Sequence, residues 1–403
     1  MATKTISDID VSGKKVLIRV DFNVPLDGGE VTDDRRIRMA LPTIKKVIDD
    51  GGKLVLMSHL GRPKGEGFEE AFSLKPAADK LAELLGKEVT LGPPEVVGSE
   101  AAKLVEKMAD GDVLLLENVR FIKAETSKDP AEVEAFAEEL AALGDVYVND
   151  AFGTCHRRHA SMHGAPEAIK AKGGPAVAGF LVEKEIKYLH EAVDAPARPF
   201  VAILGGAKVS DKIELISTLL GKVDQILIGG AMAYTLLKAQ GASVGKSLVE
   251  EDQVANMQKL LSKAGGKILL PDDHVATDDF AGGRPTDIAD VNIPDKLMGM
   301  DIGPETIARF REAILAAKTI VWNGPMGVFE RQEYAAGTKS VAVAVAQATG
   351  EGAVSVIGGG DSAAAVGMWG LDDRMTHVST GGGASLTYLE GQPMDAIEVL
   401  DAK

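Results

Sequence analysis

The chain of 403 residues is 45% hydrophobic and 26% charged, a composition typical of a folded globular protein without a long disordered segment. Its length favours two domains over one. The formal net charge of −16 disfavours nucleic acid and acidic membranes as partners, so a bound anion requires a local cluster of cations. No stretch has the pattern of a signal peptide or a membrane span, and the single cysteine, Cys155, permits no internal disulfide. These features predict a cytoplasmic protein.

Short apolar runs, separated by segments with helical patterning, recur through the first half of the chain. Such runs are typical of parallel strands that are buried on both faces. A helix is predicted between the last two runs, because apolar residues from Val133 to Leu143 fall at helical spacing after Asp129 as cap and Pro130 in the first turn. The predicted strands of this half are 15–20, 54–57, 113–116 and 146–148.

The same pattern starts again after residue 200, with predicted strands at 201–204, 225–228, 267–270, 319–322, 354–357 and 376–379. Two runs of βα units predict an α/β protein with two doubly wound, Rossmann-like parallel-sheet domains. A helical stretch near Phe180 to Ala192 and a proline-bounded segment, Pro196 to Pro199, predict a hinge helix and linker between them. The predicted boundaries are 1–175 for the first domain, 176–199 for the hinge, 200–389 for the second domain and 390–403 for a C-terminal tail.

Polar side chains follow every predicted strand of the first half. Ligands in open α/β sheets bind beyond the carboxyl ends of the strands, and guanidinium groups pair bidentately with phosphate and carboxylate. We therefore expect a site for a small anion that carries both groups. An ordinary polar sheet edge is the alternative, and the agreement of four loops weakens it. The loop residues are Asp21 and Asn23, then His59, Leu60, Gly61 and Arg62, then Arg120, and finally Arg157.

Glycine-rich turns follow the predicted strands of the second half. Glycine lets the backbone approach a phosphate or a flat base closely, although capping or close packing is the commoner reason for a single one. The turn 358–362 precedes a helical run at 363–369, so its amides would face an anion, and Asp361 within it is a candidate Mg²⁺ ligand. Five such turns at one edge favour a nucleotide site: 205–212, 229–230, 323–330, 358–362 and 380–383.

Three other patterns carry less weight. Gly241 to Ser247 has three residues between its glycines, where a P-loop has four, and predicts an ordinary surface turn. No GxGxxG follows the first predicted strand, which disfavours dinucleotide binding. The cluster His156, His159 and His163 lacks the spacing of zinc ligands. The residues assign no role to Cys155 or Arg158.

Eight segments, in order from about residue 10 to residue 400, resemble the phosphoglycerate kinase family. They are 19–25, 58–63, 116–121, 149–154, 203–212, 322–330, 358–361 and 379–383. The resemblance implies a carboxyl-accepting phosphotransferase of glycolysis, usually a monomer, that converts 1,3-bisphosphoglycerate and MgADP reversibly into 3-phosphoglycerate and MgATP. It also implies that residues from about 390 onward pack on the first domain. Because one half is expected to hold each ligand and the reacting atoms must approach to about 3 to 3.5 Å, we expect the hinge to bend during catalysis.

The resemblance implies a role for each matching residue. The triose-phosphate site comprises Asp21, Asn23, Arg36, His59, Leu60, Gly61, Arg62, Arg120 and Arg157. The nucleotide site comprises Lys208, Lys212, Gly229, Gly230, Gly299, Glu330, Gly359, Gly360, Asp361 and Ser362, with Asp361 on Mg²⁺. The catalytic groups are Arg36, Lys208, Lys212, Gly360 and Gly383. Ser362 stands where the family usually has threonine, which keeps the hydroxyl.

Two other classes of function remain open on the residues alone. One is a dinucleotide-dependent oxidoreductase on a doubly wound scaffold, which the missing GxGxxG disfavours. The other is a nucleotide-binding protein without turnover, which the full set of cationic residues disfavours. The sequence does not decide between adenine and guanine nucleotides, nor between an open and a closed state.

Overall fold

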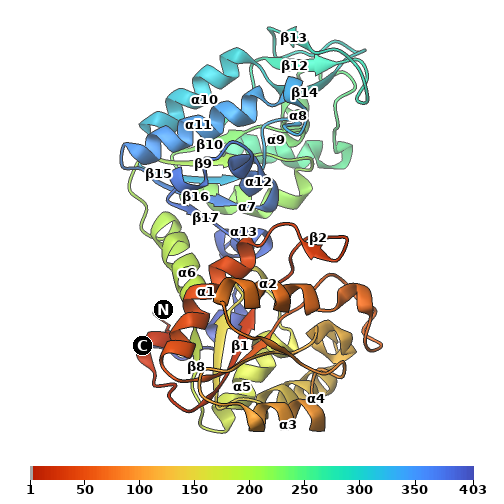
Figure 1. Ribbon diagram of the computed structural model, residues 1–403. Coiled ribbons are helices and arrows are strands. Elements are labelled where there is room, and N and C mark those ends of the chain that lie inside the picture. Colours follow the sequence, from red (N-terminus) through yellow and green to blue (C-terminus); the bar gives the residue numbers. More distant parts are fainter. Residues whose placement is uncertain (1–2) are drawn as a thin grey trace. The chain divides into compact units, whose positions relative to one another are not determined.

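The structure is a computed structural model that describes residues 3–403. The chain divides into two compact units: one takes in the chain up to Ile186 together with Pro393–Lys403, and the other is Lys187–Gln392. Both ends of the chain therefore belong to the first unit, and the second is a continuous segment (Figure 1).

The first unit is built on a parallel six-stranded sheet in the order β5-β6-β4-β1-β7-β8. Neighbouring residues of β1, such as Val16 and Leu17, are fully buried, so both faces of the sheet are covered, as the apolar runs predict. The strands are β1 Lys15–Val20, β4 Lys53–Met57, β5 Thr90–Leu91, β6 Val113–Leu115, β7 Val146–Asp150 and β8 Ala176–Ala178. A small antiparallel pair, β2 Leu26–Asp27 and β3 Glu30–Val31, follows β1.

Helices connect the strands of this sheet. In α4, the side chain of Asp129 accepts a hydrogen bond from the Ala131 amide and Pro130 occupies the first turn, which confirms the predicted cap. The helices are α1 Arg35–Asp49, α2 Lys75–Leu85, α3 Ser99–Lys107, α4 Pro130–Ala141 and α5 Ala165–Ala171. The shorter turns are η1 Ile6–Asp8, η2 Glu70–Phe72, η3 Val119–Phe121, η4 Lys123–Thr126, η5 Phe152–Thr154 and the π-helical turn η6 Ala160–Gly164.

The second unit repeats this plan with a parallel sheet in the order β11-β10-β9-β15-β16-β17. Helices α10 and α11 lie side by side over one of its faces, where Phe310 and Val345 join the core around Trp322 (Figure 1). The strands are β9 Phe200–Leu204, β10 Gln225–Ile228, β11 Ile268–Leu269, β15 Thr319–Asn323, β16 Val354–Gly358 and β17 His377–Val378. All ten predicted strands are confirmed, with ends that differ by a residue or two.

The helices of the second unit are α7 Ile213–Leu220, α8 Met232–Ala239, α9 Val254–Lys263, α10 Pro304–Ala316, α11 Ala336–Gly350, α12 Gly360–Met368 and α13 Gly382–Leu389. Its shorter turns are η7 Ser210–Lys212, η8 Glu251–Gln253, η9 Gln332–Tyr334 and η10 Asp372–Arg374. A three-stranded antiparallel sheet, which the sequence did not predict, consists of β12 His274–Thr277, β13 Thr286–Ile288 and β14 Met298–Ile302.

Helix α6, Phe180–Val193, contains the point where the two units divide. Its amino end is tied to the first unit, because the Phe180 amide donates to Thr43 Oγ1 and the Leu181 amide to Asp150 Oδ1, both at 2.9 Å. The C-terminal segment, which includes α14 Asp395–Glu398, packs on the same unit: Asn149 Nδ2 donates to the Ala396 carbonyl at 2.9 Å.

The strand order reverses once in each parallel sheet, between β1 and β7 in the first unit and between β9 and β15 in the second. Neighbouring loops leave such a point in opposite directions, and the crevice between them is where ligands bind in doubly wound folds.

In the part of the chain that the structure describes, no helix combines the length and apolar character needed to cross a bilayer.

Candidate active site

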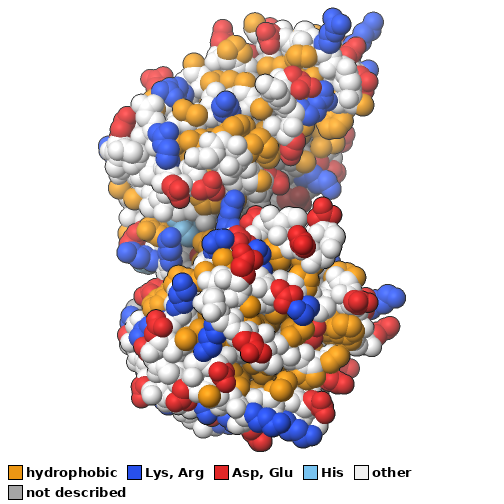
Figure 2. Space-filling view, viewed as in Figure 1, with side chains coloured by type: hydrophobic (Ala, Val, Ile, Leu, Met, Phe, Trp, Pro, Cys, Tyr) orange, Lys and Arg blue, Asp and Glu red, His pale blue; other side chains and the backbone are white. Residues whose placement is uncertain are grey.

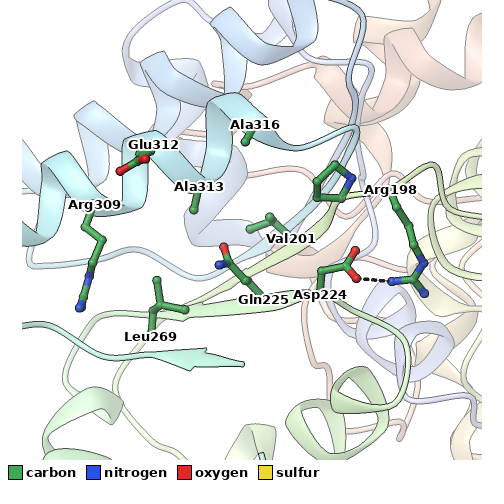
Figure 3. Close-up of a pocket in the computed structure, with 10 residues that line it drawn as sticks. Arg198, Val201, Asp224, Gln225, Leu269, Arg309, Glu312, Ala313 and Ala316 are labelled. Carbon is green, nitrogen blue, oxygen red and sulfur yellow. Dashed lines mark hydrogen bonds and ion pairs between the residues drawn. The ribbon is translucent and has the colours of Figure 1, made fainter. Parts of the chain in front are cut away.

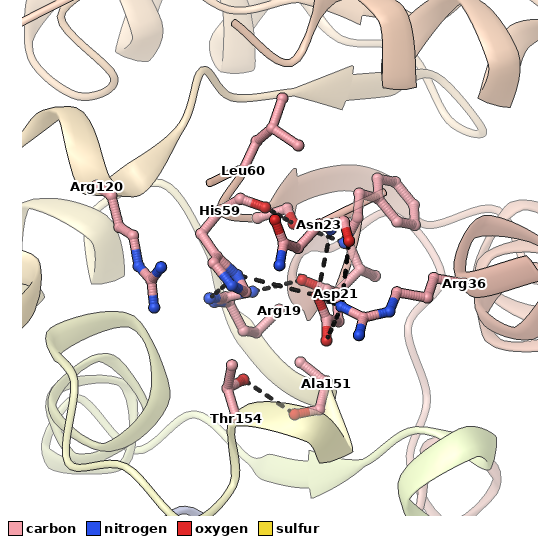
Figure 4. A network of polar contacts seen from close by, with 12 residues as sticks. Arg19, Asp21, Asn23, Arg36, His59, Leu60, Arg120, Ala151 and Thr154 are labelled. Atoms are coloured by element: carbon pink, nitrogen blue, oxygen red, sulfur yellow. Dashed lines mark hydrogen bonds and ion pairs between the residues drawn. The ribbon is translucent and has the colours of Figure 1, made fainter. Parts of the chain in front are cut away.

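Arg36 and Asp21 form an ion pair just beyond the carboxyl end of β1. Arg36 stands in the first turn of α1, and its Nη1 lies 3.0 Å from each carboxylate oxygen of Asp21 and 3.2 Å from the Asn23 carbonyl (Figure 4). Asp21 is 9% exposed and Arg36 is 36% exposed. The pair therefore anchors one nitrogen of the guanidinium and leaves donors of Arg36 accessible to an anion.

His59 lies beside this pair, in the loop after β4. The Asn23 side chain ties that loop to the one after β1, since its Oδ1 accepts from the Gly61 amide at 2.8 Å. His59 Nδ1 lies 3.2 Å from Arg19 Nη2 and 4.0 Å from Asp21 Oδ1. Burial, reinforced by the charges of the surrounding arginines, lowers the pKa of His59 well below its usual value, so the imidazole is neutral.

Arg120 reaches the same edge from η3, after β6. Its Nη1 donates to the Gly61 carbonyl at 2.7 Å. Asn118, which the sequence analysis did not single out, positions this contact: its Nδ2 donates to the carbonyl of the buried Leu60 at 2.7 Å, and its Oδ1 accepts from the Arg120 amide at 3.1 Å. Burial lowers the pKa of Arg120 to about 10, and the charges of Arg157 and Arg19 add to the shift.

Arg157 and Arg62 add further positive charge. Arg157 follows η5, is half-buried and donates from Nε to His156 Nε2 at 3.1 Å. Burial lowers the pKa of Arg157, and the charge of Asp21 opposes that shift. Arg62 is exposed and has no recorded polar partner within residues 3–403. Arginines thus outnumber carboxylates at this edge: Arg19, Arg36, Arg62, Arg120 and Arg157 gather near Asp21 and Glu125.

Lys212 occupies the point in the second unit where the strand order reverses. Its Nζ donates to the Gly205 carbonyl, after β9, at 2.6 Å and to the Asn323 carbonyl, at the end of β15, at 2.8 Å. Burial lowers the pKa of Lys212 to about 8, while the charges of Asp361 and Asp211 oppose the shift. Two carbonyl oxygens thus hold a buried ammonium at the expected ligand position.

Two helix starts meet close to Lys212. Gly359, with φ of +92°, turns the chain into α12, and a Cβ on Gly382 at the start of α13 would lie 3.1 Å from the Gly359 Cα. The approach leaves little room for a side chain at Gly382, and the positive φ favours glycine at position 359. Gly360 and Gly383, in the first turns of the two helices, are exposed. The amide groups of two helix amino ends therefore face the same region, which suits an anion.

Asp361 lies in the first turn of α12, and its exposed carboxylate makes no recorded hydrogen bond or ion pair in the described chain, although its charge acts on Lys212. Ser362 next to it is fully buried, and its Oγ accepts from the Gly324 amide at 2.6 Å, so this hydroxyl holds two loops together. Lys208 and Glu330 are both exposed, and the structure records no polar partner for either among residues 3–403.

Gly229, Gly230 and Gly299 are surrounded by protein atoms. A Cβ on Gly229 would lie 2.6 Å from Met326 Sδ, and one on Gly299 would lie 1.9 Å from the Tyr234 hydroxyl. Gly230 has φ of +67°, and its Cβ would lie 2.5 Å from the Gly206 amide nitrogen. Internal packing therefore accounts for glycine at these three positions, and their contact with the adenine stays a prediction.

Asn323 is the first residue of the glycine-rich turn 323–330, and the sequence predicts no role for it. Its side chain is buried, and its Nδ2 lacks a hydrogen-bond partner while pointing toward Gly359, whose Cβ would lie 3.1 Å away. Asn323 ends β15 much as Asn118 follows β6. Both could have been found from their position after a strand, because short amides at a sheet edge commonly hold loops or ligands.

Cys155 and Arg158 lie outside the cluster of arginines. Cys155 is fully buried, and burial raises the pKa of its thiol, so it is an inert part of the core. The Arg158 guanidinium lies 3.6 Å from the carboxylate of Asp395 in α14.

A separate pocket of about 750 Å³ lies near the amino ends of β9 and β10, where Val201 and Gln225 stand, against α10 (Figure 3). None of the residues predicted for ligand binding lines it, and both of its arginines are paired, Arg198 with Asp224 and Arg309 with Asp272.

On the face drawn in Figure 2, basic and acidic side chains are interspersed over both units. The surplus of positive charge is therefore a local feature of the edge beyond β1, β4, β6 and β7.

Comparison with known proteins gives one consistent result. The family model described as phosphoglycerate kinase matches residues 6–392. Phosphoglycerate kinases of Rhodopirellula baltica and Chloroherpeton thalassium are 56% and 55% identical, over 100% and 99% of both chains respectively. The solved structure of phosphoglycerate kinase from Coxiella burnetii is similar with a TM-score of 0.87 and 39% identity, and that from Pyrococcus horikoshii with 0.85 and 32%, each over 98% of both chains.

Proposed function

The chain belongs to the phosphoglycerate kinase family, and we propose that its two units divide the substrates of that enzyme, the first holding the triose phosphate and the second the nucleotide. The function is that of a phosphoglycerate kinase, a transferase of glycolysis with a carboxyl group as acceptor. The residues that perform each part of the reaction, the metal, the monomeric state and the cytoplasmic location are our proposals.

The surplus of arginines beyond β1, β4, β6 and β7 is the observation that carries the assignment. A triose phosphate presents a phosphate at one end and a carboxylate or acyl phosphate at the other, and guanidinium groups bind both kinds of oxygen. The free donors of Arg36, Arg62, Arg120 and Arg157 come from four separate segments of the first unit and suit a ligand with charge at two ends. Asp21, Asn23, Leu60 and Gly61 would hold these loops or contact the ligand's hydroxyl.

The nucleotide assignment rests on Lys212 and the paired starts of α12 and α13. An ammonium and two sets of helix amides would bind the polyphosphate. We propose that Lys208 and the loop Gly359–Ser362 contribute to the same site, that Glu330 contacts the ribose, and that Gly229, Gly230 and Gly299 border the adenine. Lys208 and Glu330 are exposed and free of recorded partners within the described chain, which leaves them available.

Asp361 fits a nucleotide-bound Mg²⁺. Magnesium is often held by one or two carboxylates together with phosphate oxygens, and the Asp361 carboxylate is exposed and makes no recorded hydrogen bond or ion pair within residues 3–403. The described residues contain no group of three or more His, Cys, Asp or Glu side chains that could hold a metal ion. When bound, Mg²⁺ would neutralise phosphate charge at the site of transfer.

The chemistry asks little of the protein beyond position and charge. The nucleophile is an oxygen of ADP, or of the 3-phosphoglycerate carboxylate in the reverse direction, so no catalytic base is required. We propose that Arg36, Lys208, Lys212 and the amides of Gly360 and Gly383 stabilise the charge on the migrating phosphoryl group. Such preorganised donors act most strongly where water is excluded.

A coupled assay with 3-phosphoglycerate, ATP and Mg²⁺ tests the proposal. We expect 1,3-bisphosphoglycerate to form, and we expect its formation to stop when the metal is chelated and to resume when Mg²⁺ is restored. Folded protein that binds ADP yet transfers no phosphoryl group would overturn the proposal in favour of a nucleotide-binding protein without turnover.

A further inference from the structure

We propose that Arg19 is a positioning residue that holds His59 as the neutral tautomer with its proton on Nε2, so that this imidazole donates a hydrogen bond to the bound triose phosphate. The inference deepens the proposed function, because it rests on the first unit binding that ligand. It assigns a task to the one arginine of the cluster that is fully buried and that the sequence analysis left without a role.

The geometry around Arg19 fixes the direction of each hydrogen bond. Its Nε donates to Ser161 Oγ at 2.8 Å, its Nη1 donates to the Val20 carbonyl, and its Nη2 lies 3.2 Å from His59 Nδ1. A guanidinium group has donors only, so His59 Nδ1 must be the acceptor. A neutral imidazole that accepts at Nδ1 carries its single hydrogen on Nε2.

Buried polar groups fix the orientation of the Arg19 guanidinium. Ser161 Oγ donates to Glu125 Oε1 at 2.7 Å while it accepts from Arg19, and the Ser161 amide donates to Glu125 Oε2 at 2.9 Å. Arg19, Ser161 and Glu125 are all fully buried. This chain of contacts gives the guanidinium one orientation, and therefore gives the imidazole in front of it one orientation and one tautomer.

The other charged groups around His59 act in two directions. Asp21 Oδ1 lies 4.0 Å from Nδ1 and would favour a proton there, but Arg19 is closer and supplies the hydrogen itself. Arg36, Arg120 and Arg157 disfavour the imidazolium, as does burial. Burial and these four arginines together hold the pKa of His59 well below its usual value, which agrees with the neutral imidazole that the Arg19 contact requires.

The consequence concerns the ligand side of the ring. In the described chain no protein group is recorded as a partner of His59 Nε2, so its N–H is available to an oxygen of the triose phosphate. His59 then contributes a neutral, directional donor beside four cations, and it acts neither as a base nor as a fifth positive charge.

Nitrogen-15 NMR of the histidine side chains tests this directly in the wild-type protein, with the signals of His59 assigned by their loss in His59→Gln. We expect a pyridine-type signal for Nδ1 and a pyrrole-type signal for Nε2, both constant across the range around pH 6.5 in which an ordinary histidine titrates. Saturating 3-phosphoglycerate should shift the Nε2–H signal and leave the tautomer unchanged. A proton on Nδ1, or titration of His59 in this range, would overturn the proposal.

Variants separate the role of Arg19 from that of charge alone. Arg19→Met removes the group that donates a hydrogen bond to His59 Nδ1, and Asp21 becomes the nearest charged group to that nitrogen. We therefore expect His59 to shift toward the tautomer protonated on Nδ1 or toward the imidazolium. The KM for 3-phosphoglycerate should rise roughly tenfold or more, the scale of losing a hydrogen bond to a charged group, with the KM for ATP unchanged. Arg38→Met is the matched control, because Arg38 is exposed and pairs with Asp34.

Ser161→Ala is the gentler variant should Arg19→Met fold poorly. It removes the hydroxyl that accepts from Arg19 Nε, so the change in the His59 tautomer and the rise in KM for 3-phosphoglycerate should have the same direction as in Arg19→Met but be smaller. If His59 keeps the Nε2–H tautomer in every folded variant, Arg19 is not what fixes it and the proposal fails. Failure of the proposed function has a different signature: 3-phosphoglycerate would leave all His59 signals unchanged in a wild-type protein that nevertheless has the expected tautomer.

Discussion

The ammonium of Lys212 lies 2.8 Å from the backbone carbonyl of Asn323, at the point where the strand order of the second sheet reverses. A second carbonyl, that of Gly205, lies 2.6 Å away on the neighbouring strand's loop. A buried cation with two neutral acceptors retains its full charge for a ligand, in contrast to Arg36, which is paired with Asp21. Lys212 is therefore the residue of the second unit whose change should have the clearest effect.

Lys212→Ala should reduce kcat by a factor of about 10² or more, the scale of removing one preorganised charge donor. The pH profile supplies the finer test. Because the pKa of Lys212 is lowered to about 8, the ammonium loses its proton as the pH rises through that value, and kcat/KM for the nucleotide should fall there. Lys212→Arg should move this fall to higher pH. A near-normal kcat in Lys212→Ala, or a fall that Lys212→Arg does not move, would remove Lys212 from the catalytic groups.

Asp361→Asn should raise the Mg²⁺ concentration needed for half-maximal activity by about tenfold or more, since a neutral amide is a poorer magnesium ligand than a carboxylate. Activity at fixed ATP, titrated with Mg²⁺, measures this. Asp295→Asn, at another exposed aspartate of the same unit, is the control for loss of one negative charge. An unchanged Mg²⁺ requirement in Asp361→Asn would move the metal to another residue.

Asp150→Asn should remove a pH dependence of stability. Burial raises the pKa of Asp150 to about 7, and its Oδ2 has no partner, so the native protein binds a proton that the unfolded chain releases near pH 4. Stability should therefore fall as the pH rises from about 4 to 7. The variant keeps an acceptor for the Leu181 amide and, at pH 8, should be more stable than the wild type by on the order of a few kcal/mol.

Urea unfolding of both proteins at pH 5 and pH 8 measures this difference. Asp301, whose pKa burial likewise raises to about 7, stays in the second unit of both proteins and cancels from the comparison. Equal pH dependence in the two proteins would mean that Asp150 is ionised at little cost in the native state.

The sequence predicted the parts of the fold where apolar runs are long, and it missed the parts where the strands are short or polar. Strand β1 is buried along almost its whole length, whereas β13, Thr286–Ile288, is largely exposed and carries no hydrophobic alternation. The pattern of buried apolar runs therefore does not predict the antiparallel sheet of β12, β13 and β14. Strand β5 is partly exposed, and β8 has alanine at two of its three positions, so neither shows the run of large apolar residues that marked the other parallel strands.

The sequence likewise predicts some features of the candidate site and misses others. Strand order explains why side chains after β1, β4, β6 and β7 meet, and that much follows from the pattern of the sequence. Position after a strand does not say whether a polar side chain faces a ligand or holds a loop. Ser362 accepts a hydrogen bond from the Gly324 amide. Asn118 forms hydrogen bonds with the backbone of Leu60 and of Arg120. Arg19 forms a hydrogen bond with His59. Such internal partners, far apart in sequence, appear only in three dimensions.

Ligands should bring the two units closer together. Phosphoryl transfer requires the reacting atoms to approach to about 3 to 3.5 Å, and under the proposed division each unit binds one ligand only. Closure also shields the acyl phosphate from water. Small-angle scattering of the free protein, both binary complexes and a ternary complex with a non-reacting ligand pair measures the radius of gyration, which we expect to be smallest in the ternary complex. The same value in all four states would contradict hinge bending.

The division of the substrates between the two units is the central claim, and titration calorimetry with 3-phosphoglycerate and with MgADP tests it most directly. Arg120→Ala should weaken 3-phosphoglycerate binding roughly tenfold or more and leave MgADP binding unchanged, because Arg120 belongs to the first unit. Lys212→Ala should do the reverse. Circular dichroism confirms that each variant is folded. Equal loss of both ligands in either folded variant, or loss of the wrong ligand, would contradict the division.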